Sequence, residues 1–506
     1  MRRSIRGSSI KSERPKARRT EWLLCLLWVL SAFPAEAQTL TKRLDALLDT
    51  PPLNRHLWGV AIADSTGRTI FTRNADRLFI PASNTKLLVT SAAAVLLPPD
   101  WTARTSLYAT GPVVNGVLQG HLVLYGRGDP TMARRCFSVD TTLSGVCQAD
   151  PFAPLRDLAR RLAARGITAI AGDVVGDGSW FEPTMVHPAW ETGDLAWWYA
   201  APVSGLGFAD NSLEVVATAT TPGAPATVTF SPDFGNVVLE NRTRTAPVMS
   251  RATYDIVRDP VNGHLVAIGE VPMGGKPQTS YVAVEDPSLY SALALRQALS
   301  ENGIAVLGGT RSTVDSMLFR DARNSAVLAE VGSRPLRDWL FPILNTSQNW
   351  FAEMLIKELG RTQANAGSWD AGIEVVRRFL IDSVGVDSTE VSQSDGSGLS
   401  AQNFVAPAAF LRILSYMRKH PRYAVFAAGL PRSGVPGSLR NRFLGTPLEG
   451  QVVAKTGSIA GVNTLSGYVT RPDGKTLLVS IQANHHALGG RAMIAAIDSV
   501  VVAVSR

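Results

Sequence analysis

The chain has 506 residues, of which 45% are hydrophobic and 18% are charged, a composition that excludes disordered and fibrous proteins. The length allows two or three domains. The net charge of +8 is concentrated at the start, because residues 1–37 hold eight basic and three acidic side chains and leave only +3 for the rest. A charge that small gives no reason to expect nucleic-acid binding.

The first 37 residues have the order of a secretory signal peptide. A basic stretch precedes the apolar run 22–33, and Ala35 and Ala37 provide the small residues of a cleavage site. The apolar run is shorter than the roughly 20 residues of a membrane-spanning helix, which makes an uncleaved anchor the weaker alternative. Arg18-Arg19 resembles a twin-arginine signal, but Glu21 stands where such signals have an apolar residue. We expect general secretory export to the periplasm or the medium; a later start of translation stays open.

Export also determines how the cysteines are interpreted. Cys25 leaves with the leader, so the mature chain keeps Cys136 and Cys147. Two cysteines eleven residues apart in an oxidising compartment predict one disulfide that closes a small loop. No histidine flanks them, and the seven histidines show no metal-binding spacing. We therefore expect no metal and no cofactor.

The first predicted elements are a hairpin and a buried helix. Residues 57–63 and 69–73 are β-rich runs around a glycine-containing turn, which predicts the hairpin. The stretch Pro81-Ala82-Ser83-Asn84-Thr85-Lys86 follows, and the run after it is apolar on all sides up to Leu97, as in a buried helix.

Ser83 and Lys86 are candidates for nucleophilic catalysis. They are three residues apart and so share a helix face. A desolvated lysine loses its proton more easily and can take the proton of a serine hydroxyl. The alternative is that Ser83 only caps the helix. The spacing alone is not specific, because Ser8 and Lys11 repeat it inside the leader.

The middle of the chain predicts a large insertion. Residues 102–305 consist mainly of short β-rich runs between turn residues, with helical patterns at 155–165 and 288–302. Helix-rich segments precede and follow this region. We therefore expect a catalytic domain in two parts, 38–101 and 306–506, separated by a mainly β insertion of two nested subdomains.

The last part of the chain predicts helices followed by strands. Helices are expected at 350–359, where Gly360 would end the helix, and at 370–383 and 406–419. Strands are expected at 451–455, 463–470 and 476–484. A final helix at 492–504 is almost free of charge, so it predicts a buried element rather than an amphipathic membrane anchor.

Two further polar clusters lie in this part. Ser347-Gln348-Asn349 precedes the apolar helix, and Lys455-Thr456-Gly457-Ser458 ends a strand. A lysine and hydroxyls at a strand end can bind a carboxylate and an extended peptide, and Gly457 lets the backbone approach a ligand. Taken singly, the first cluster is more often a helix cap and the second a strand that ends at a turn.

In this order, the three clusters resemble the motif set of penicillin-binding proteins and serine β-lactamases, although Gln348 replaces the usual aspartate. The chain as a whole resembles the D-alanyl-D-alanine carboxypeptidase/endopeptidases of the low-molecular-mass class C penicillin-binding proteins. The resemblance implies an α/β (α+β) fold of the transpeptidase type shared with serine β-lactamases, with a large mainly β insertion. Further similar segments are residues 126–131, 199–204, 210–212, 395–403 and 430–443.

The resemblance also implies a mechanism. Ser83 would form an acyl-enzyme with peptidoglycan peptides that end in D-Ala-D-Ala, and β-lactams would acylate the same serine. Lys86 would be the base, Ser347 and Lys455 would pass the proton to the leaving amine, and Asn349 would hold the substrate. Thr456, Gly457 and Ser458 would bind the substrate. The alternatives are a β-lactamase or esterase on the same scaffold and a non-catalytic wall-binding protein. The sequence makes no prediction about oligomeric state.

Overall fold

The computed structural model describes residues 40–140, 150–259 and 261–506. The predicted signal peptide, residues 1–37, lies outside them. Cys136 is disulfide-bonded, and its predicted partner, Cys147, also lies outside the described residues.

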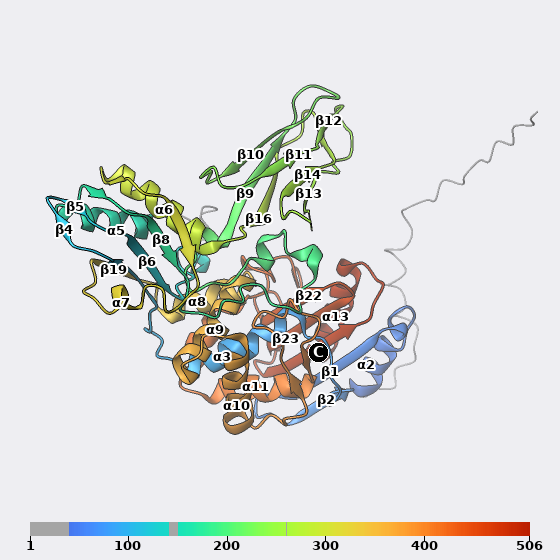
Figure 1. The fold of residues 1–506 in the computed structure, drawn as a ribbon. Coiled ribbons are helices and arrows are strands. Elements are labelled where there is room, and N and C mark those ends of the chain that lie inside the picture. The colour runs from blue at the N-terminus through green and yellow to red at the C-terminus, as the bar shows by residue number, and fades with distance from the viewer. Residues whose placement is uncertain (1–39, 141–149, 260) are drawn as a thin grey trace, which may run out of the picture.

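A five-stranded antiparallel sheet forms the centre of the catalytic body (Figure 1). β1 pairs along its whole length with β24, so strands from the two ends of the chain lie side by side. This sheet therefore joins the part of the chain before the insertion to the part after it. In spatial order its strands are β2 (Thr69–Arg73), β1 (Leu57–Asp64), β24 (Thr476–Asn484), β23 (Val462–Thr470) and β22 (Val452–Ile459).

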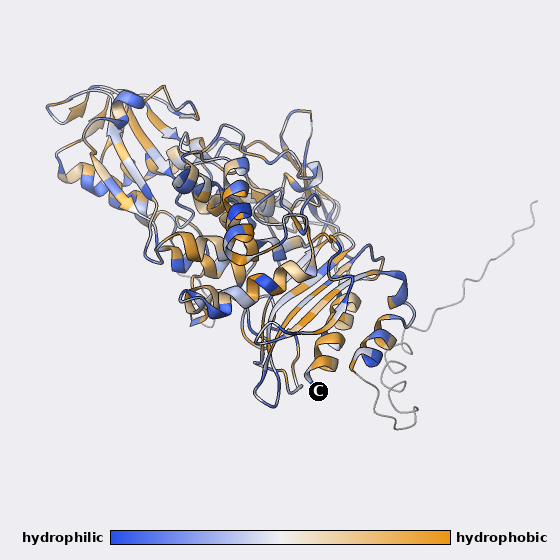
Figure 2. Ribbon diagram, turned by 90° about the horizontal axis from the view of Figure 1, so that it is seen from below, coloured by the Kyte–Doolittle hydropathy of each residue, from blue (hydrophilic) through white to orange (hydrophobic). Residues whose placement is uncertain are grey.

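Two helices cover one face of this sheet. They are α2 (Leu40–Leu48) and α13 (Gly490–Ser505), and their apolar side chains pack with those of the strands in one core. Figure 2 shows hydrophobic residues gathered along the strands and on the helix that leads to the C-terminus. The predicted last helix is therefore present, and its apolar residues are used in the core.

A cluster of helices covers the opposite face, and a second core fills the space between them. α3 (Thr85–Leu96) is the innermost helix: every residue from Thr85 to Ala94 is buried, as its apolar sequence predicts. A short two-stranded ribbon, β20 (Val391–Ser392) and β21 (Phe404–Val405), lies beside these helices. The other helices on this face of the sheet are α8 (Leu336–Leu344), α9 (Asn349–Ala364), α10 (Trp369–Arg378), a π-helical turn η7 (Phe379–Val384), α11 (Pro407–Lys419) and α12 (Tyr423–Ala428).

The expected end of α9 at Gly360 is wrong, because the helix continues to Ala364. A Cβ atom at position 360 would lie 2.6 Å from the carbonyl oxygen of Ala366 and 2.8 Å from the amide nitrogen of Gly372. Gly360 is therefore needed for the close packing of α10 against α9. The helix ends where Asn365 adopts a left-handed conformation, with φ 54°.

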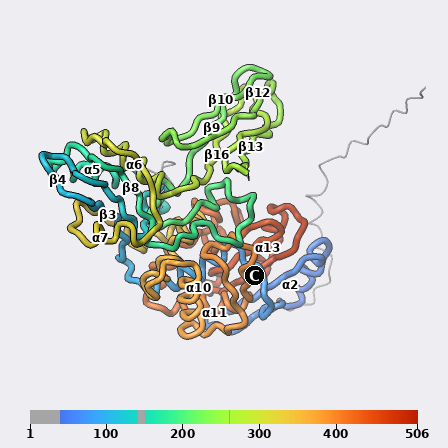
Figure 3. The backbone as a smooth tube through the Cα atoms, in the orientation of Figure 1, coloured from blue at the N-terminus to red at the C-terminus, as the bar shows by residue number. Residues whose placement is uncertain are grey.

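The insertion forms two lobes that project from the catalytic body (Figure 3). The first lobe carries α5 (Ala153–Ala164) and α6 (Pro287–Glu301) against two sheets. The larger sheet has the order β18 (Thr310–Thr313), β8 (Val174–Asp177), β6 (Leu122–Arg127), β3 (Arg104–Ala109) and β19 (Ala329–Gly332). The smaller has the order β17 (Ala305–Val306), β7 (Ala169–Ile170), β5 (Val117–Leu118) and β4 (Val113–Val114).

The second lobe is built from small sheets. Its longest strands are β9 (Ser212–Thr218), β10 (Thr227–Ser231) and β16 (Gln278–Ala283), which form one sheet. Its remaining strands are β11 (Leu239–Asn241), β14 (Leu265–Ile268) and β13 (Asp255–Arg258) in a second sheet, and β12 (Arg244–Ala246) with β15 (Glu270–Pro272) in a third.

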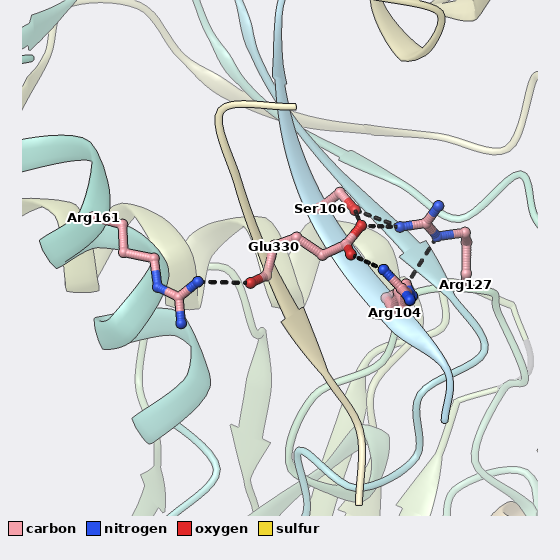
Figure 4. Close-up of polar contacts among 5 residues, drawn as sticks. All are labelled: Arg104, Ser106, Arg127, Arg161 and Glu330. Atoms are coloured by element: carbon pink, nitrogen blue, oxygen red, sulfur yellow. Dashed lines mark hydrogen bonds and ion pairs between the residues drawn. The ribbon is translucent and has the colours of Figure 1, made fainter. Parts of the chain in front are cut away.

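β19 is bound to the first lobe by a polar cluster around Glu330 (Figure 4). The Glu330 carboxylate accepts hydrogen bonds from Arg127 Nη2 and Ser106 Oγ, both at 2.7 Å, and forms an ion pair with Arg104. Arg161 of α5 donates to the Glu330 backbone oxygen at 3.1 Å. Since β18 and β19 both belong to this sheet, we place the end of the insertion after Gly332 rather than at residue 305.

Candidate active site

Ser83 lies in a short 3₁₀ turn, η3 (Ala82–Asn84), that leads directly into α3. The turn is bound to the central sheet, because Thr464 Oγ1 on β23 donates to the carbonyl oxygen of Pro81 at 2.8 Å. Ala82 has a positive φ of 47°, an uncommon conformation for alanine. Ser83 itself is partly exposed, so the turn presents its hydroxyl to solvent from a buried support.

Lys86 lies one helical turn after Ser83, and its side chain is completely buried. Its Nζ donates to three oxygens: Ser83 Oγ at 2.9 Å, Asn349 Oδ1 at 2.7 Å and the carbonyl oxygen of Ser397 at 2.7 Å. Burial lowers the pKa of Lys86 to about 7, against the opposing charges of Glu353 and Asp395. A neutral Lys86 can therefore form near neutral pH, and its lone pair can accept the proton of the Ser83 hydroxyl.

Ser347 and Asn349 lie at the start of α9 and contact the two buried lysines. Ser347 has a positive φ of 64°, and its Oγ accepts a hydrogen bond from Lys455 Nζ at 2.8 Å. Asn349 contacts Lys86 through its oxygen, and its Nδ2 donates to the carbonyl oxygen of Tyr199 at 2.9 Å. Gln348, between them, points inward and caps α9 by accepting from the backbone N–H of Trp350.

Lys455 is the second completely buried amine of the site. Besides Ser347, it contacts the carbonyl oxygen of Thr456 at 2.7 Å. Burial lowers the pKa of Lys455 well below its usual value, and the charge of Lys86 lowers it further. The charged form of Lys86 thus disfavours the charged form of Lys455.

Thr456, Gly457 and Ser458 lie on β22, the edge strand of the central sheet. Thr456 Oγ1 donates to Ser438 Oγ at 2.9 Å, and Asn463 Nδ2 donates to Ser458 Oγ at 3.0 Å. A Cβ atom on Gly457 would lie 2.2 Å from Thr464 Oγ1 and 3.0 Å from the Ser83 amide nitrogen. The absence of a side chain thus lets the strand pack against the Ser83 turn.

The structure brings together the predicted residues of all three clusters. Two direct contacts make this connection: Lys86 joins Ser83 to Asn349, and Lys455 joins its strand to Ser347. Ser83, Ser347, Thr456 and Ser458 keep exposed surface, while both amines are buried. The site is therefore a row of accessible hydroxyls supported by two buried amines.

Sequence reasoning missed the third oxygen that receives Lys86, the carbonyl of Ser397. A backbone carbonyl leaves no trace in a sequence pattern, and the resemblance of residues 395–403 assigns them no role. Sequence reasoning also gave no role to Glu353, which is completely buried. Its spacing was a usable signal, because a residue four positions after Asn349 shares its helix face.

In the part of the chain that the structure describes, no cluster of three or more His, Cys, Asp or Glu side chains could hold a metal ion. None of the helices between residues 40 and 506, the unplaced segments aside, is both long and apolar enough to cross a membrane.

Comparisons with protein families, individual sequences and solved structures all find D-Ala-D-Ala carboxypeptidases or penicillin-binding proteins. Residues 40–504 match the model of the D-Ala-D-Ala carboxypeptidase 3 (S13) family. The chain is 33% identical over 500 residues to the D-alanyl-D-alanine carboxypeptidase of Actinomadura sp. (strain R39), which covers 94% of this chain and 87% of that protein. The crystal structure of penicillin-binding protein 4 from Haemophilus influenzae superposes with a TM-score of 0.76 at 25% identity, over 88% of this chain and 94% of that one. A β-lactam complex of the same protein superposes with a TM-score of 0.70 at 23% identity, over 88% and 94%.

Proposed function

Because the chain belongs to the D-Ala-D-Ala carboxypeptidase 3 (S13) family, we propose a mechanism in which Ser83 is its nucleophile and Lys86 its base. The protein is a penicillin-binding D-Ala-D-Ala carboxypeptidase, a serine-type hydrolase with the fold of penicillin-binding protein 4. The observation that carries the mechanistic proposal is the position of Lys86 Nζ, buried and 2.9 Å from Ser83 Oγ.

Acylation begins when neutral Lys86 takes the proton of Ser83 and Ser83 Oγ attacks the carbonyl carbon of the D-Ala–D-Ala bond. The C–N bond then breaks, and the leaving amine receives a proton from Ser347, which Lys455 contacts at 2.8 Å. The proton that Lys86 took from Ser83 replaces the one that Ser347 gives away, so acylation leaves both groups as they were. D-alanine departs and leaves an ester on Ser83. Water hydrolyses that ester and restores the serine.

The edge strand β22 supports substrate binding. An extended peptide can add to such an edge through its backbone, while Thr456 and Ser458 bind the terminal carboxylate and Lys455 adds positive charge. The backbone N–H groups of Ser83 and Ser458 would hold the developing oxyanion. Each such donor contributes about 3–4 kcal/mol to transition-state stabilisation. β-Lactams would bind at the same strand edge and acylate Ser83.

The proposed location is the periplasm or the exterior of the cell, where peptidoglycan is found. Support comes from the signal-peptide pattern of residues 1–37. The apolar face of α13 packs into the core of the central sheet. We propose that the enzyme also cleaves peptide cross-links, since a cross-link carries the same type of acyl carbonyl.

The test is incubation with a pentapeptide that ends in D-Ala-D-Ala and with cross-linked muropeptides. We expect free D-alanine from the first and separated stem peptides from the second, and neither from the Ser83→Ala variant. Product release by that variant would refute the role of Ser83. Fast turnover of penicillin, without a long-lived adduct, would instead favour a β-lactamase.

A further inference from the structure

Glu353 is a buried carboxylate behind the nucleophile. It lies on α9 four residues after Asn349, and its side chain has no exposed surface. Its Oε1 accepts from the backbone N–H of Ser397 at 2.7 Å. Its Oε2 accepts from the N–H of Gly396 at 2.9 Å and from Trp369 Nε1 at 2.8 Å. Three N–H donors at these distances favour the ionised form of a carboxylate.

Ser397 connects this carboxylate to the reactive amine. The N–H of Ser397 binds Glu353, and its carbonyl oxygen accepts from Lys86 Nζ at 2.7 Å. The next residues are fixed independently, because Asp395 accepts from the N–H groups of Gly398 and Ser400, each at 2.7 Å. Glu353 therefore holds the residue of this loop whose carbonyl oxygen accepts from Lys86.

The loop and the helix are shaped for this contact. A Cβ atom on Gly396 would lie 2.7 Å from the carbonyl oxygen of Ala352 and 3.1 Å from Glu353 Oε2. Glycine at this position thus lets the backbone reach the carboxylate.

The other charged and titratable groups around Glu353 come from four parts of the chain. Lys86 lies on α3, and Asp395 lies in the loop. Lys357 follows one turn later on α9, with its Nζ 3.4 Å from the centre of the Trp369 ring and 3.1 Å from Glu182 Oε1. His187 of the insertion packs edge-on against Trp369, with 5.0 Å between ring centres. Among these, Lys86 is the group that reacts.

We propose that Glu353 is a positioning residue for acylation, which keeps the Ser397 carbonyl on the Lys86 amine and places a negative charge behind it. The inference rests on the proposed role of Lys86 as the base for Ser83. Removal of this charge favours the neutral form of Lys86 at lower pH, while loss of the Ser397 contact misplaces the amine. Loss of the charge changes the pH at which acylation begins, whereas loss of the Ser397 contact changes the maximal rate of acylation.

The pKa values of Lys86 and Glu353 agree with the electrostatic effect that we propose for the Glu353 charge. Burial lowers the pKa of Lys86 to about 7, and Glu353 is the largest opposing influence. Burial, assisted by the charge of Asp395, raises the pKa of Glu353 to about 7, while its hydrogen bonds from Ser397, Trp369 and Gly396 oppose this. Both groups thus change charge close to neutrality, so they influence each other where the enzyme works.

The experiment measures the rate of acylation by a fluorescent penicillin as a function of pH, together with the fraction of protein labelled at saturation. The variants are Glu353→Gln, which removes the charge, and Glu353→Asp, which keeps it on a shorter side chain. Glu358→Gln is the matched control: this carboxyl lies on the same helix, is equally buried and also accepts from a tryptophan, Trp180, at 2.9 Å.

We expect Glu353→Gln to move the acidic limb of the profile to lower pH by roughly one unit, the size of effect that a nearby charge has on a pKa. The maximal rate should fall by about tenfold or more, since small misplacements of a reacting group have effects of that order. Glu353→Asp should lose rate but keep the wild-type acidic limb. Glu358→Gln should leave the limb in place.

An unshifted limb in Glu353→Gln, or an equal shift in Glu358→Gln, would overturn the inference and leave the proposed function intact. If Glu353→Gln does not fold, a Glu353→Asp variant with the wild-type rate overturns it instead. Absence of labelling in the wild-type protein would be a different result, because it would refute the proposed function itself.

Discussion

Gly398 is the position at which the structure makes its sharpest prediction about loop geometry. Its φ is +80°, and a Cβ atom there would lie 1.9 Å from the carbonyl oxygen of Ala82 and 2.7 Å from Thr85 Oγ1. Ala82 directly precedes the nucleophile, and Gly398 directly follows the residue whose carbonyl contacts Lys86. Gly398→Ala therefore pushes apart the two segments that hold Ser83 and Lys86.

The size of the effect follows from these distances. Ordinary contact begins at 3.4 Å, so the backbone must move by about 1.5 Å to accept the methyl group. A displacement of about 1 Å at a reacting centre can reduce a rate by about 100-fold. The positive φ adds about 1 kcal/mol of destabilisation, because alanine tolerates this conformation poorly.

The assay compares acylation by a fluorescent penicillin and thermal unfolding for Gly398→Ala and Gly385→Ala. Gly385 has almost the same φ, +78°, but no atom lies within 4 Å of its Cβ position. It thus isolates the conformational cost from the clash. We expect Gly385→Ala to lower Tm slightly at full acylation rate, and Gly398→Ala to lose both Tm and about 100-fold in rate. Equal rates and equal Tm in the two variants would refute the reasoning.

Two further predictions follow from the same site. Ser347→Ala removes the proposed proton donor to the leaving amine and should slow acylation by about 100-fold or more, with some loss of Tm because buried Lys455 loses an acceptor; stopped-flow labelling at the wild-type rate would contradict that role. Lys86→Met should abolish labelling yet change stability in a pH-dependent way. Burial lowers the folded-state pKa of Lys86 from 10.5 to about 7, so between these values the unfolded chain binds more protons and wild-type stability rises with pH. Methionine does not titrate, so the variant gains most over wild type below pH 7, by at most about 5 kcal/mol, and loses this advantage as the pH approaches 10.5. A Tm difference that stays constant across this range would contradict the shifted pKa.

Much of the fold can be predicted where local pattern and burial agree. The apolar run after Lys86 predicts α3 because the helix is buried on all sides, and β-rich runs between turn residues predict β23 and β24. The short helix α12 was not predicted, since it is six residues long and has little pattern of its own. Gly360 misled the prediction of α9 because its role depends on α10, which packs against it.

The extent of the insertion could not be predicted for a related reason. β18 and β19 are four-residue strands whose partners, β8 and β3, lie more than 100 residues earlier in the chain. Pairing over such a distance has no local signature. The ion pairs of Glu330 that secure β19 likewise involve residues from different strands, so each of them looks like an ordinary surface charge in the sequence.

The catalytic candidates also divide into residues that a local motif reveals and contacts that only the fold reveals. Ser83, Lys86, Ser347 and Lys455 belong to motifs whose residue types and order are informative without any structure. The contacts that organise them are not informative in the sequence, because Ser397 contributes a backbone oxygen and Glu353 lies in a helix where a glutamate usually faces solvent. The structure was needed to connect Glu353 with Lys86.

The most direct test of the central claim is the site of covalent attachment. The protein is incubated with penicillin and digested, and the peptides are examined by mass spectrometry. We predict that the peptide containing Ser83 carries the whole mass of the penicillin on the Ser83 side chain, and that folded Ser83→Ala protein carries no adduct. An adduct on a different residue, or an adduct that persists in Ser83→Ala, would contradict the account.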